Sequence, residues 1–241
     1  MADSKILSEQ DKKEIARYLG YGKVKPDPET ESLIDIVAEE AISAVEFRRI
    51  YISAPVLDCA DDASELNAAD EPDALGKLEI LGKRISSTGL ARNLTGCDRC
   101  YIIAASLGAE CDRLMARYAS ASMAKAVVLQ AVCTQLLETR LNELERELAD
   151  LPENSGKIFR PRFSPGYGDL DIALQGWILK VLEAPKKIGL SLTQSKMLTP
   201  SKSVTAFLGV ARADGCPEKG TVFESGCSSC DKKDCAMRQE N

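Results

Sequence analysis

Apolar positions at helical spacing mark the helices of this chain. They recur three and four residues apart from Ile15 to Leu19, and again from Leu33 to Val45. This period predicts two helices within the first 50 residues. Ser8 to Asp11 is typical of the capped start of the first helix. The most regular stripe, which is rich in leucine, predicts a long amphipathic helix from Met123 to Leu148.

Shorter apolar and β-branched runs predict strands. They cover residues 47–56, 78–80, 99–105, 188–192 and 204–210. Further helices are expected through Ile85 to Leu94, from Ala109 to Tyr118, and from a cap at Asp169 onward. Strands and helices do not alternate as regular β-α-β units. The pattern therefore predicts an α+β fold, with a mostly antiparallel twisted sheet flanked by helices and a helical N-terminal region.

The 241 residues divide by pattern into three parts. Residues 1–75 form a helical region with one strand, and residues 76–212 form an α+β core. Residues 213–241 form a Cys-rich tail.

The amino-acid composition excludes several classes of function. Hydrophobic residues make up 44% and charged residues 28% of the chain, which is ordinary for a globular protein with a real core. The net charge of −6 argues against a nucleic-acid partner, which requires a concentrated basic surface. The sequence contains no histidine, which excludes Ser–His and Cys–His catalysis and histidine metal ligands.

The cellular setting follows from the same sequence. No apolar run reaches the ~18 residues of a membrane span, and no basic-then-apolar signal peptide opens the chain. Nine cysteines without an export signal indicate a reducing compartment. We therefore expect a cytoplasmic protein without a membrane partner.

The loop at residues 160–169 is the most informative segment. Two prolines and two glycines in ten residues exclude a helix or a central strand. Arg162 offers a guanidinium suited to a carboxylate, and Tyr167 offers an aromatic face. The loop suits a small ligand with a carboxylate and an aromatic base. The alternative is a rigid surface turn before a capped helix.

This loop also carries a resemblance to a known family. Arg162-Phe163-Ser164-Pro165-Gly166-Tyr167, followed by Gln175, resembles the S-adenosylmethionine-binding loop of the activation domain of cobalamin-dependent methionine synthase. Residues 189–193 and 200–205 are similar to that family's Gly-x-x-Leu-Thr and Pro-x-x-Ser-Val elements. Ala104 to Gly108 is similar to its Leu-Gly segment, and Ala131 to Glu138 is similar to the helix that carries its ligand-binding glutamate.

The resemblance implies a function. The chain would be a stand-alone activation subunit, an accessory component of a methyltransferase. It would cap the corrinoid and bind S-adenosylmethionine for reductive methylation of cob(II)alamin. The cobalamin would be supplied by the partner, a corrinoid-bearing methionine synthase that lacks its own activation domain. An electron donor protein would be the second partner.

The resemblance also implies roles for individual residues. Arg162 would bind the carboxylate of S-adenosylmethionine, and Glu138 its sulfonium-bearing amino acid end. The backbone from Ser164 through Pro165 to Gly166 would hydrogen-bond the nucleoside. Tyr167 would lie near the corrin.

The tail holds a second candidate site. Cys227, Cys230 and Cys235, with Cys216 upstream, provide four soft ligands for zinc or an iron–sulfur cluster. Free thiols or a disulfide are the alternatives. Cys97 and Cys100 form a further Cys-x2-Cys that we interpret as a buried pair.

Two other functions stay open at this point. No N-terminal aspartate aligns with the family's ligand-binding aspartate, and Leu208 stands where the long enzymes have a tyrosine. The chain could therefore be a structural docking subunit that does not bind S-adenosylmethionine. Alternatively, the Cys tail could relay an electron to cobalt.

Overall fold

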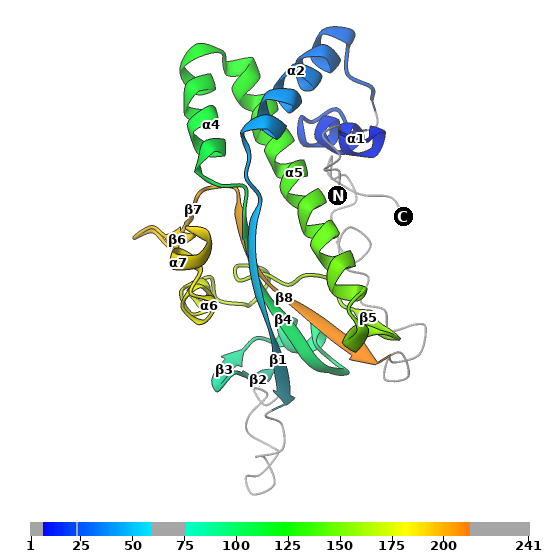
Figure 1. Cartoon of the computed structure of the whole chain (residues 1–241), viewed down its shortest axis with the longest axis vertical. Coiled ribbons are helices and arrows are strands. Elements are labelled where there is room, and N and C mark those ends of the chain that lie inside the picture. Colours follow the sequence, from blue (N-terminus) through cyan, green and yellow to red (C-terminus); the bar gives the residue numbers. More distant parts are fainter. Residues whose placement is uncertain (1–6, 23, 59–75, 213–241) are drawn as a thin grey trace, which may run out of the picture.

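The structure is a computed structural model that describes residues 7–22, 24–58 and 76–212 (Figure 1). Its helices are α1 (Glu9–Tyr18), α2 (Pro28–Ala44), α3 (Thr88–Asn93), α4 (Ala109–Ala121), α5 (Met123–Ala149), α6 (Leu174–Leu182) and α7 (Ala184–Ile188), with a 3-10 turn at Pro152–Asn154. Its strands are β1 (Arg48–Asp58), β2 (Lys77–Ile80), β3 (Lys83–Ser86), β4 (Cys97–Ser106), β5 (Lys157–Phe159), β6 (Ser191–Leu192), β7 (Leu198–Thr199) and β8 (Ser203–Arg212). The predicted α+β class is confirmed.

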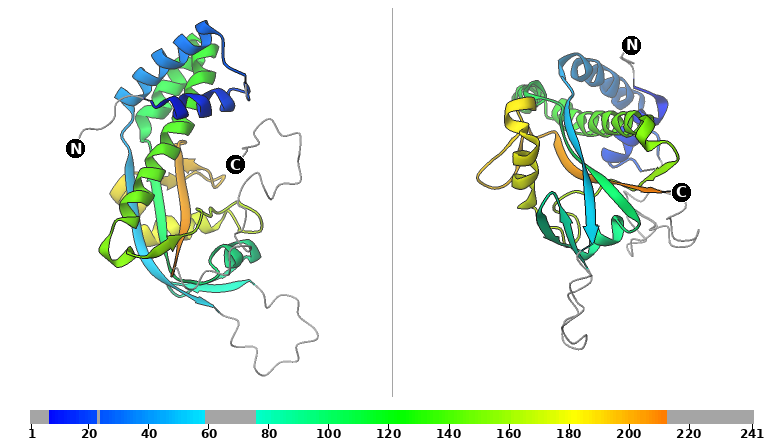
Figure 2. Two further views of the ribbon diagram at one scale, coloured as in Figure 1. Left: turned by 90° about the vertical axis from the view of Figure 1, so that its right-hand side faces the viewer. Right: turned by 60° about the horizontal axis from the view of Figure 1, so that its bottom comes forward.

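Six strands form one twisted sheet in the order β3-β2-β1-β4-β8-β5, and every neighbouring pair is antiparallel (Figure 2). β4 lies at the centre and pairs with β1 on one side and β8 on the other. β6 and β7 form a separate two-stranded hairpin.

Helices cover both faces of the sheet, so β4 is buried on both sides. Successive side chains of a strand point to opposite faces. Tyr101 and Ile103 pack against Leu144 and Leu148 of α5, whereas Ile102 packs in the cluster that α6 and α7 contribute to. Figure 1 shows α5 on one side of the sheet and α6 and α7 on the other.

A third cluster lies beyond the end of the sheet, where α1, α2, α4 and the first half of α5 pack together (Figure 1). Its fully buried members include Ile15, Val37, Leu129 and Val132. The expected cap of the first helix is confirmed, because the Ser8 side chain accepts a hydrogen bond from the Asp11 backbone.

The long helix predicted from the leucine stripe is α5, which has 27 residues. Its first half packs against the other helices and its second half against the sheet. Within the described ranges, no helix combines the length and the apolarity needed to cross a membrane.

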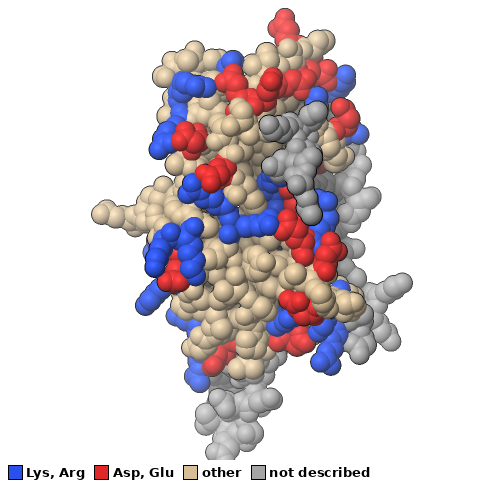
Figure 3. Space-filling view, viewed as in Figure 1, with Lys and Arg blue, Asp and Glu red and all other residues tan. Residues whose placement is uncertain are grey.

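Charged side chains of both signs are interspersed on the face seen in Figure 3. Several of them form ion pairs between elements. Arg49 of β1, for example, pairs with Glu147 of α5 at 2.5 Å. Such exposed pairs contribute little to stability, typically below ~1 kcal/mol.

The prediction for residues 77–94 was partly wrong. The expected strand at 78–80 is present, but Ile85 lies in a second strand, β3, and the helix begins only at Thr88. Leu81 and Gly82 both have positive φ, at 50° and 72°, and turn β2 directly into β3. A hairpin turn of this kind is usually marked by Asn-Gly or Asp-Gly, so the Leu-Gly pair gave no clear signal.

The prediction of a strand at 188–192 was also partly wrong. Helix α7 continues to Ile188, and only Ser191 and Leu192 are extended. Gly189, at φ 69°, ends the helix in the left-handed conformation that glycine favours.

Asp169 caps a different helix from the one expected. Its Oδ1 accepts hydrogen bonds from Ser87 Oγ at 2.6 Å and from the Gly89 N–H at 3.0 Å, and its Oδ2 accepts one from the Thr88 N–H at 2.6 Å. These donors form the N-terminus of α3, which is 80 residues away in sequence. α6 has no side-chain cap at its N-cap residue. Asp169 therefore fixes the end of the 160–169 loop to α3.

The packing of α5 on the sheet predicts the effect of one deletion. Leu144→Ala should lower the free energy of unfolding by about 2–5 kcal/mol, because Leu144 is 1% exposed between α5 and the sheet. Val127→Ala on the same helix is the matched control, since Val127 is 52% exposed, and should change stability by less than about 1 kcal/mol. Urea unfolding of the three proteins measures both. Equal losses for the two variants would contradict this packing.

The Asp169 contacts predict a pH-dependent effect. Asp169→Ala should cost about 1 kcal/mol near neutral pH, as the loss of a helix cap does. Hydrogen bonds from Ser87 and from the Gly89 and Thr88 backbone lower the pKa of Asp169 below its ordinary 3.8. The carboxylate therefore stabilises the fold above that pH, and the difference between wild type and variant should shrink as the pH falls through the native pKa. Urea midpoints across this pH range test the prediction, and a difference that does not change with pH would contradict it.

Candidate functional site

The loop that precedes α6 is held against the outer edge of β8. Phe163 exchanges two backbone hydrogen bonds with Phe207, of 2.9 and 2.8 Å, and the Arg160 N–H donates to the Gly209 carbonyl. The loop therefore extends the sheet edge beyond β5. Phe163 packs in the cluster that includes α6, and its neighbour Arg162 reaches α5 on the other side, as alternation along an extended chain requires.

A tight turn follows at Ser164–Tyr167. The Tyr167 N–H donates to the Ser164 carbonyl at 3.1 Å. Gly166 has φ +95°, and proline followed by a positive-φ glycine is typical of a type II turn. Pro165 is buried, whereas Tyr167 is 64% exposed. The turn therefore presents a tyrosine ring to solvent on a constrained backbone.

Arg162 is the centre of a charged cluster with α5. Its guanidinium donates to Glu138 at 2.8 Å and to Glu145 at 2.5 Å. Two further hydrogen bonds of 3.1 Å reach the Asn142 side-chain oxygen. The three acceptors are four and three residues apart and so lie on one face of α5. The cluster ties the loop to the helix.

The charges of this cluster do not balance. One guanidinium faces two carboxylates, which leaves one negative charge when all three groups are ionised. Burial raises the pKa of Glu145, the charge of Arg162 opposes this rise, and Glu138 adds to it. Glu138 is the more exposed carboxylate, at 43% against 29% for Glu145. The site therefore favours an additional cation beside Glu138.

A cavity of about 380 Å³ lies beside the cluster. This volume is within the range of small-molecule sites. The cavity is lined by Glu138, Leu141, Glu145, Pro161, Arg162, Ser164, Tyr167 and Val204. Carboxylate, guanidinium, hydroxyl and aromatic groups thus meet around one space.

The start of helix α1 supports the turn of α5 that bears Glu138, through contacts on either side of that residue. Asp11 Oδ1 accepts hydrogen bonds of 2.8 Å from both Gln135 and Thr139, while Asp11 Oδ2 accepts one from the Ser8 N–H. Burial raises the pKa of Asp11, but these hydrogen bonds outweigh it and the pKa is lowered. The ionised carboxylate therefore joins the cap of α1 to the helix that bears the site.

Two segments named in the sequence resemblance lie side by side. In the β4–β8 pairing, Ala104 faces Thr205 and Ser106 faces Ser203. Ser203 Oγ donates to Ser106 Oγ at 2.8 Å or to the Pro200 carbonyl at 2.7 Å. This pairing places Val204 at the wall of the cavity.

The structure brings together four of the six predicted ligand-binding residues. Glu138, Arg162, Ser164 and Tyr167 all line the cavity, whereas Pro165 and Gly166 shape the turn without lining it. Asn142 and Glu145 were missed by the sequence analysis. The sequence did contain a signal for them, because residues four and seven positions after Glu138 lie on the same face of a predicted helix.

Gln175, the last residue of the resembling stretch, lies in the first turn of α6 and is 8% exposed. Its side-chain oxygen is buried and has no hydrogen-bond partner among the described residues.

The predicted metal ligands Cys216, Cys227, Cys230 and Cys235 lie outside the described residues. Within residues 7–22, 24–58 and 76–212, no group of three or more metal-ligating side chains comes together. In the other Cys-x2-Cys, Cys100 is buried and Cys97 half-buried. Burial raises the pKa of Cys100 to about 12, so its thiol stays protonated at neutral pH.

Among known proteins, solved structures with this fold are found, and one of them is a reactivation domain. No protein-family model matches the chain, and no curated protein matches it either. The reactivation-domain structure is described as "Crystal Structure of the MetH Reactivation Domain bound to AdoHcy". It is similar over 81% of this chain and 74% of its own, at a TM-score of 0.56 and 17% sequence identity. The chain therefore has the fold of the MetH reactivation domain.

Proposed function

We propose that this chain acts as the activation subunit of a cobalamin-dependent methionine synthase and binds S-adenosylmethionine beside α5. The observation that carries the proposal is the cluster of Arg162, Glu138 and Glu145 around the cavity. The fold supports it, because the similar reactivation domain was solved with AdoHcy bound.

The charges of the site suit S-adenosylmethionine. The ligand carries a carboxylate, an ammonium and a sulfonium group, and so has one net positive charge. The cluster carries one net negative charge, and opposite charges attract more strongly where water is partly excluded. AdoHcy lacks the sulfonium charge and so gains less from the same site.

Binding requires an exchange of partners at Arg162. The ligand carboxylate would replace one carboxylate of α5 on the guanidinium, since a guanidinium binds carboxylates in the same planar geometry. Glu138 is the more exposed of the two glutamates and is the one we expect to move. Once released, it would face the ammonium or sulfonium group of the ligand.

The remaining loop atoms would hold the nucleoside. Ser164 lines the cavity at the start of a turn restricted by Pro165 and by the positive φ of Gly166, so little conformational entropy is lost on binding. Tyr167, exposed at the rim of the cavity, would contact the corrinoid of the partner.

The corrinoid, carried by the partner methionine synthase, would supply the metal centre that accepts the methyl group, and an electron donor protein would supply the electron. The contribution of this chain is to position the methyl donor. Methyl transfer requires no acid–base pair from the chain, which agrees with its lack of histidine.

A docking subunit that does not bind S-adenosylmethionine is the second candidate. It is favoured by one observation: Arg162 already has partners in Glu138, Asn142 and Glu145, so the ligand carboxylate must displace one of them. The electron-relay hypothesis rests on the Cys tail and stays a prediction. The three-part domain division and the cytoplasmic location also stay predictions.

The role of Arg162 predicts a loss of binding. Arg162→Ala should weaken S-adenosylmethionine binding by about 30-fold or more, the cost of leaving a partly buried charge unpaired. Isothermal titration calorimetry measures this. Arg84→Ala removes the same charge from β3, where the side chain is 79% exposed, and should leave binding unchanged. If wild type binds a corrinoid methionine synthase but shows no heat with S-adenosylmethionine, the docking-subunit hypothesis is correct instead.

The excess negative charge predicts ligand selectivity. Wild type should bind S-adenosylmethionine up to about fivefold more tightly than AdoHcy, equivalent to ~1 kcal/mol for one additional ion pair. Glu138→Gln should bring this ratio close to one. Glu143→Gln is the matched control, since Glu143 lies on the same helix but pairs with Arg140. Competition titrations with both ligands provide the ratios, and an unchanged ratio in Glu138→Gln would refute the role of that carboxylate.

A further inference from the structure

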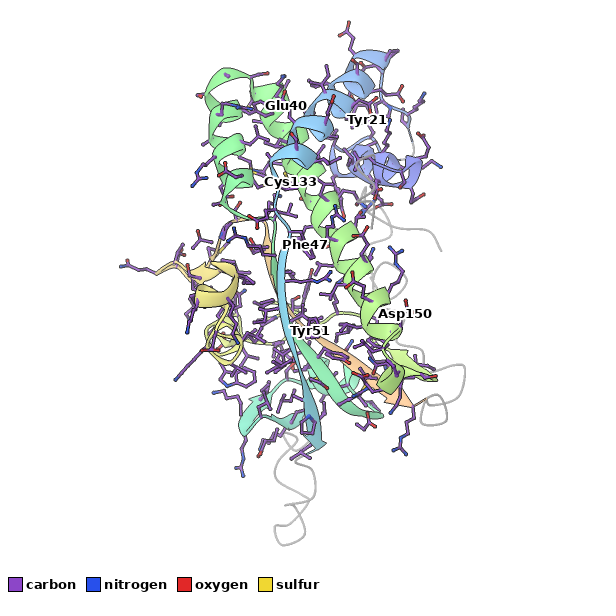
Figure 4. All side chains as sticks on the ribbon, viewed as in Figure 1. Tyr21, Glu40, Phe47, Tyr51, Cys133 and Asp150 are labelled. Atoms are coloured by element: carbon purple, nitrogen blue, oxygen red, sulfur yellow. The ribbon has the colours of Figure 1, made fainter. Side chains whose placement is uncertain are left out.

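Two buried thiols, one on α4 and one on α5, lie in contact at the helical end of the molecule. Cys111 Sγ lies 3.1 Å from Cys133 Sγ. Both side chains are 0% exposed, and both are free thiols. Cys133 lies in the first half of α5, in the part of the molecule where α4 runs beside it (Figure 4). Neither thiol lines the cavity of the proposed function.

The distance between the two sulfurs is short enough for a covalent bond to form with little movement. A disulfide requires an S–S distance of about 2.0 Å, so the two sulfurs need to approach by roughly 1 Å. The bond would close a loop between positions 22 residues apart, and both positions belong to helices that already pack together in one cluster.

Cys111 has the features of the more reactive thiol. It is the third residue of α4, a helix of 13 residues, and the N-cap Gly108 provides no side-chain cap. A helix N-terminus stabilises a thiolate. The hydrogen bond between the two thiols lowers the pKa of Cys111, and the charge of Lys202 acts in the same direction, whereas burial and Asp112 oppose them.

Lys202 is a partly buried cation near this pair. Its ammonium donates to the Gln130 carbonyl at 3.2 Å and to Thr134 Oγ1 at 2.8 Å, so it lies against the turn of α5 that bears Cys133. Burial lowers the pKa of Lys202, and the two thiols and Asp112 oppose this shift. The carboxylate of Asp112 is itself held by the Ser201 N–H at 2.9 Å. The ammonium group of Lys202 is thus fixed in place near Asp112 and the two thiols.

We propose that Cys111 and Cys133 are a redox-active pair that a peroxide converts to a disulfide between α4 and α5. The Cys111 sulfur attacks one peroxide oxygen, the O–O bond breaks, and the departing oxygen leaves as water with the thiol proton. Cys111 is then a sulfenic acid. The Cys133 sulfur attacks the Cys111 sulfur, the S–O bond breaks, and a second water leaves with the Cys133 proton. Two thiols and one hydrogen peroxide thus give one disulfide and two waters.

The disulfide is detected in the full chain treated with hydrogen peroxide under otherwise anaerobic conditions. Remaining thiols are alkylated after unfolding, and the protein is cut after Arg, Lys and Glu. Cleavage after Glu110 separates Cys111 from Cys100, so the peptide pair Cys111–Cys133 is unambiguous by mass spectrometry. We expect this cross-link to form, to be reversed by dithiothreitol, and to raise the thermal midpoint of the protein.

Three variants test the assigned order of attack. Cys133→Ser should accumulate a sulfenic acid at Cys111, trapped as its dimedone adduct. Cys111→Ser should give no adduct at Cys133. Cys100→Ser removes another buried thiol and should leave the cross-link unchanged. The proposal is overturned if both thiols of the wild type remain alkylatable after oxidation, or if either is found joined to another cysteine. Calorimetry with S-adenosylmethionine is unaffected by this outcome, so this inference and the proposed function fail independently.

Discussion

The pairing of β4 with β8 is the constraint on which the rest of the structure depends. Both strands are buried on both faces, so their register determines what lies on each side of the sheet. The pairing brings Ser106 beside Ser203 and places Val204 at the cavity wall. On the outer edge of β8, Phe163 of the loop pairs with Phe207 in an antiparallel bridge. A one-residue shift in register would reverse the faces and separate Arg162 from α5.

Arg162 connects structure and function in two ways. In the free chain its guanidinium joins the loop to α5 through three acceptors, and this contact holds the cavity in shape. In the proposed complex the same guanidinium binds the ligand instead. The loop is therefore held to α5 without ligand, and under the proposed function the excess of one carboxylate would provide the preference for a cationic ligand. The thiol pair between α4 and α5 lies outside the cavity, although the same helix α5 contributes to both.

Sequence patterns were reliable where one element buries one regular stripe. The leucine spacing of α5 and the Ser8 cap of α1 were both predicted and both confirmed. Patterns failed where a residue acts on a distant element. Asp169 was expected to cap the next helix, and it caps α3 instead. Its donors lie about 80 residues away, and no local pattern reports contacts at that separation. The Leu81–Gly82 turn was missed because leucine rarely adopts a positive φ.

The amino-acid sequence by itself determined the class of the fold, the periodicity of α5 and the chemical character of the 160–169 loop. These depend on local spacing, on proline and glycine geometry, and on the residue types present. Only the tertiary structure decided that Glu138, Asn142 and Glu145 share one guanidinium, and that Cys111 meets Cys133. Both contacts are between residues of different elements. Their distances are set by the packing of the sheet and the helices, and local sequence does not encode that packing.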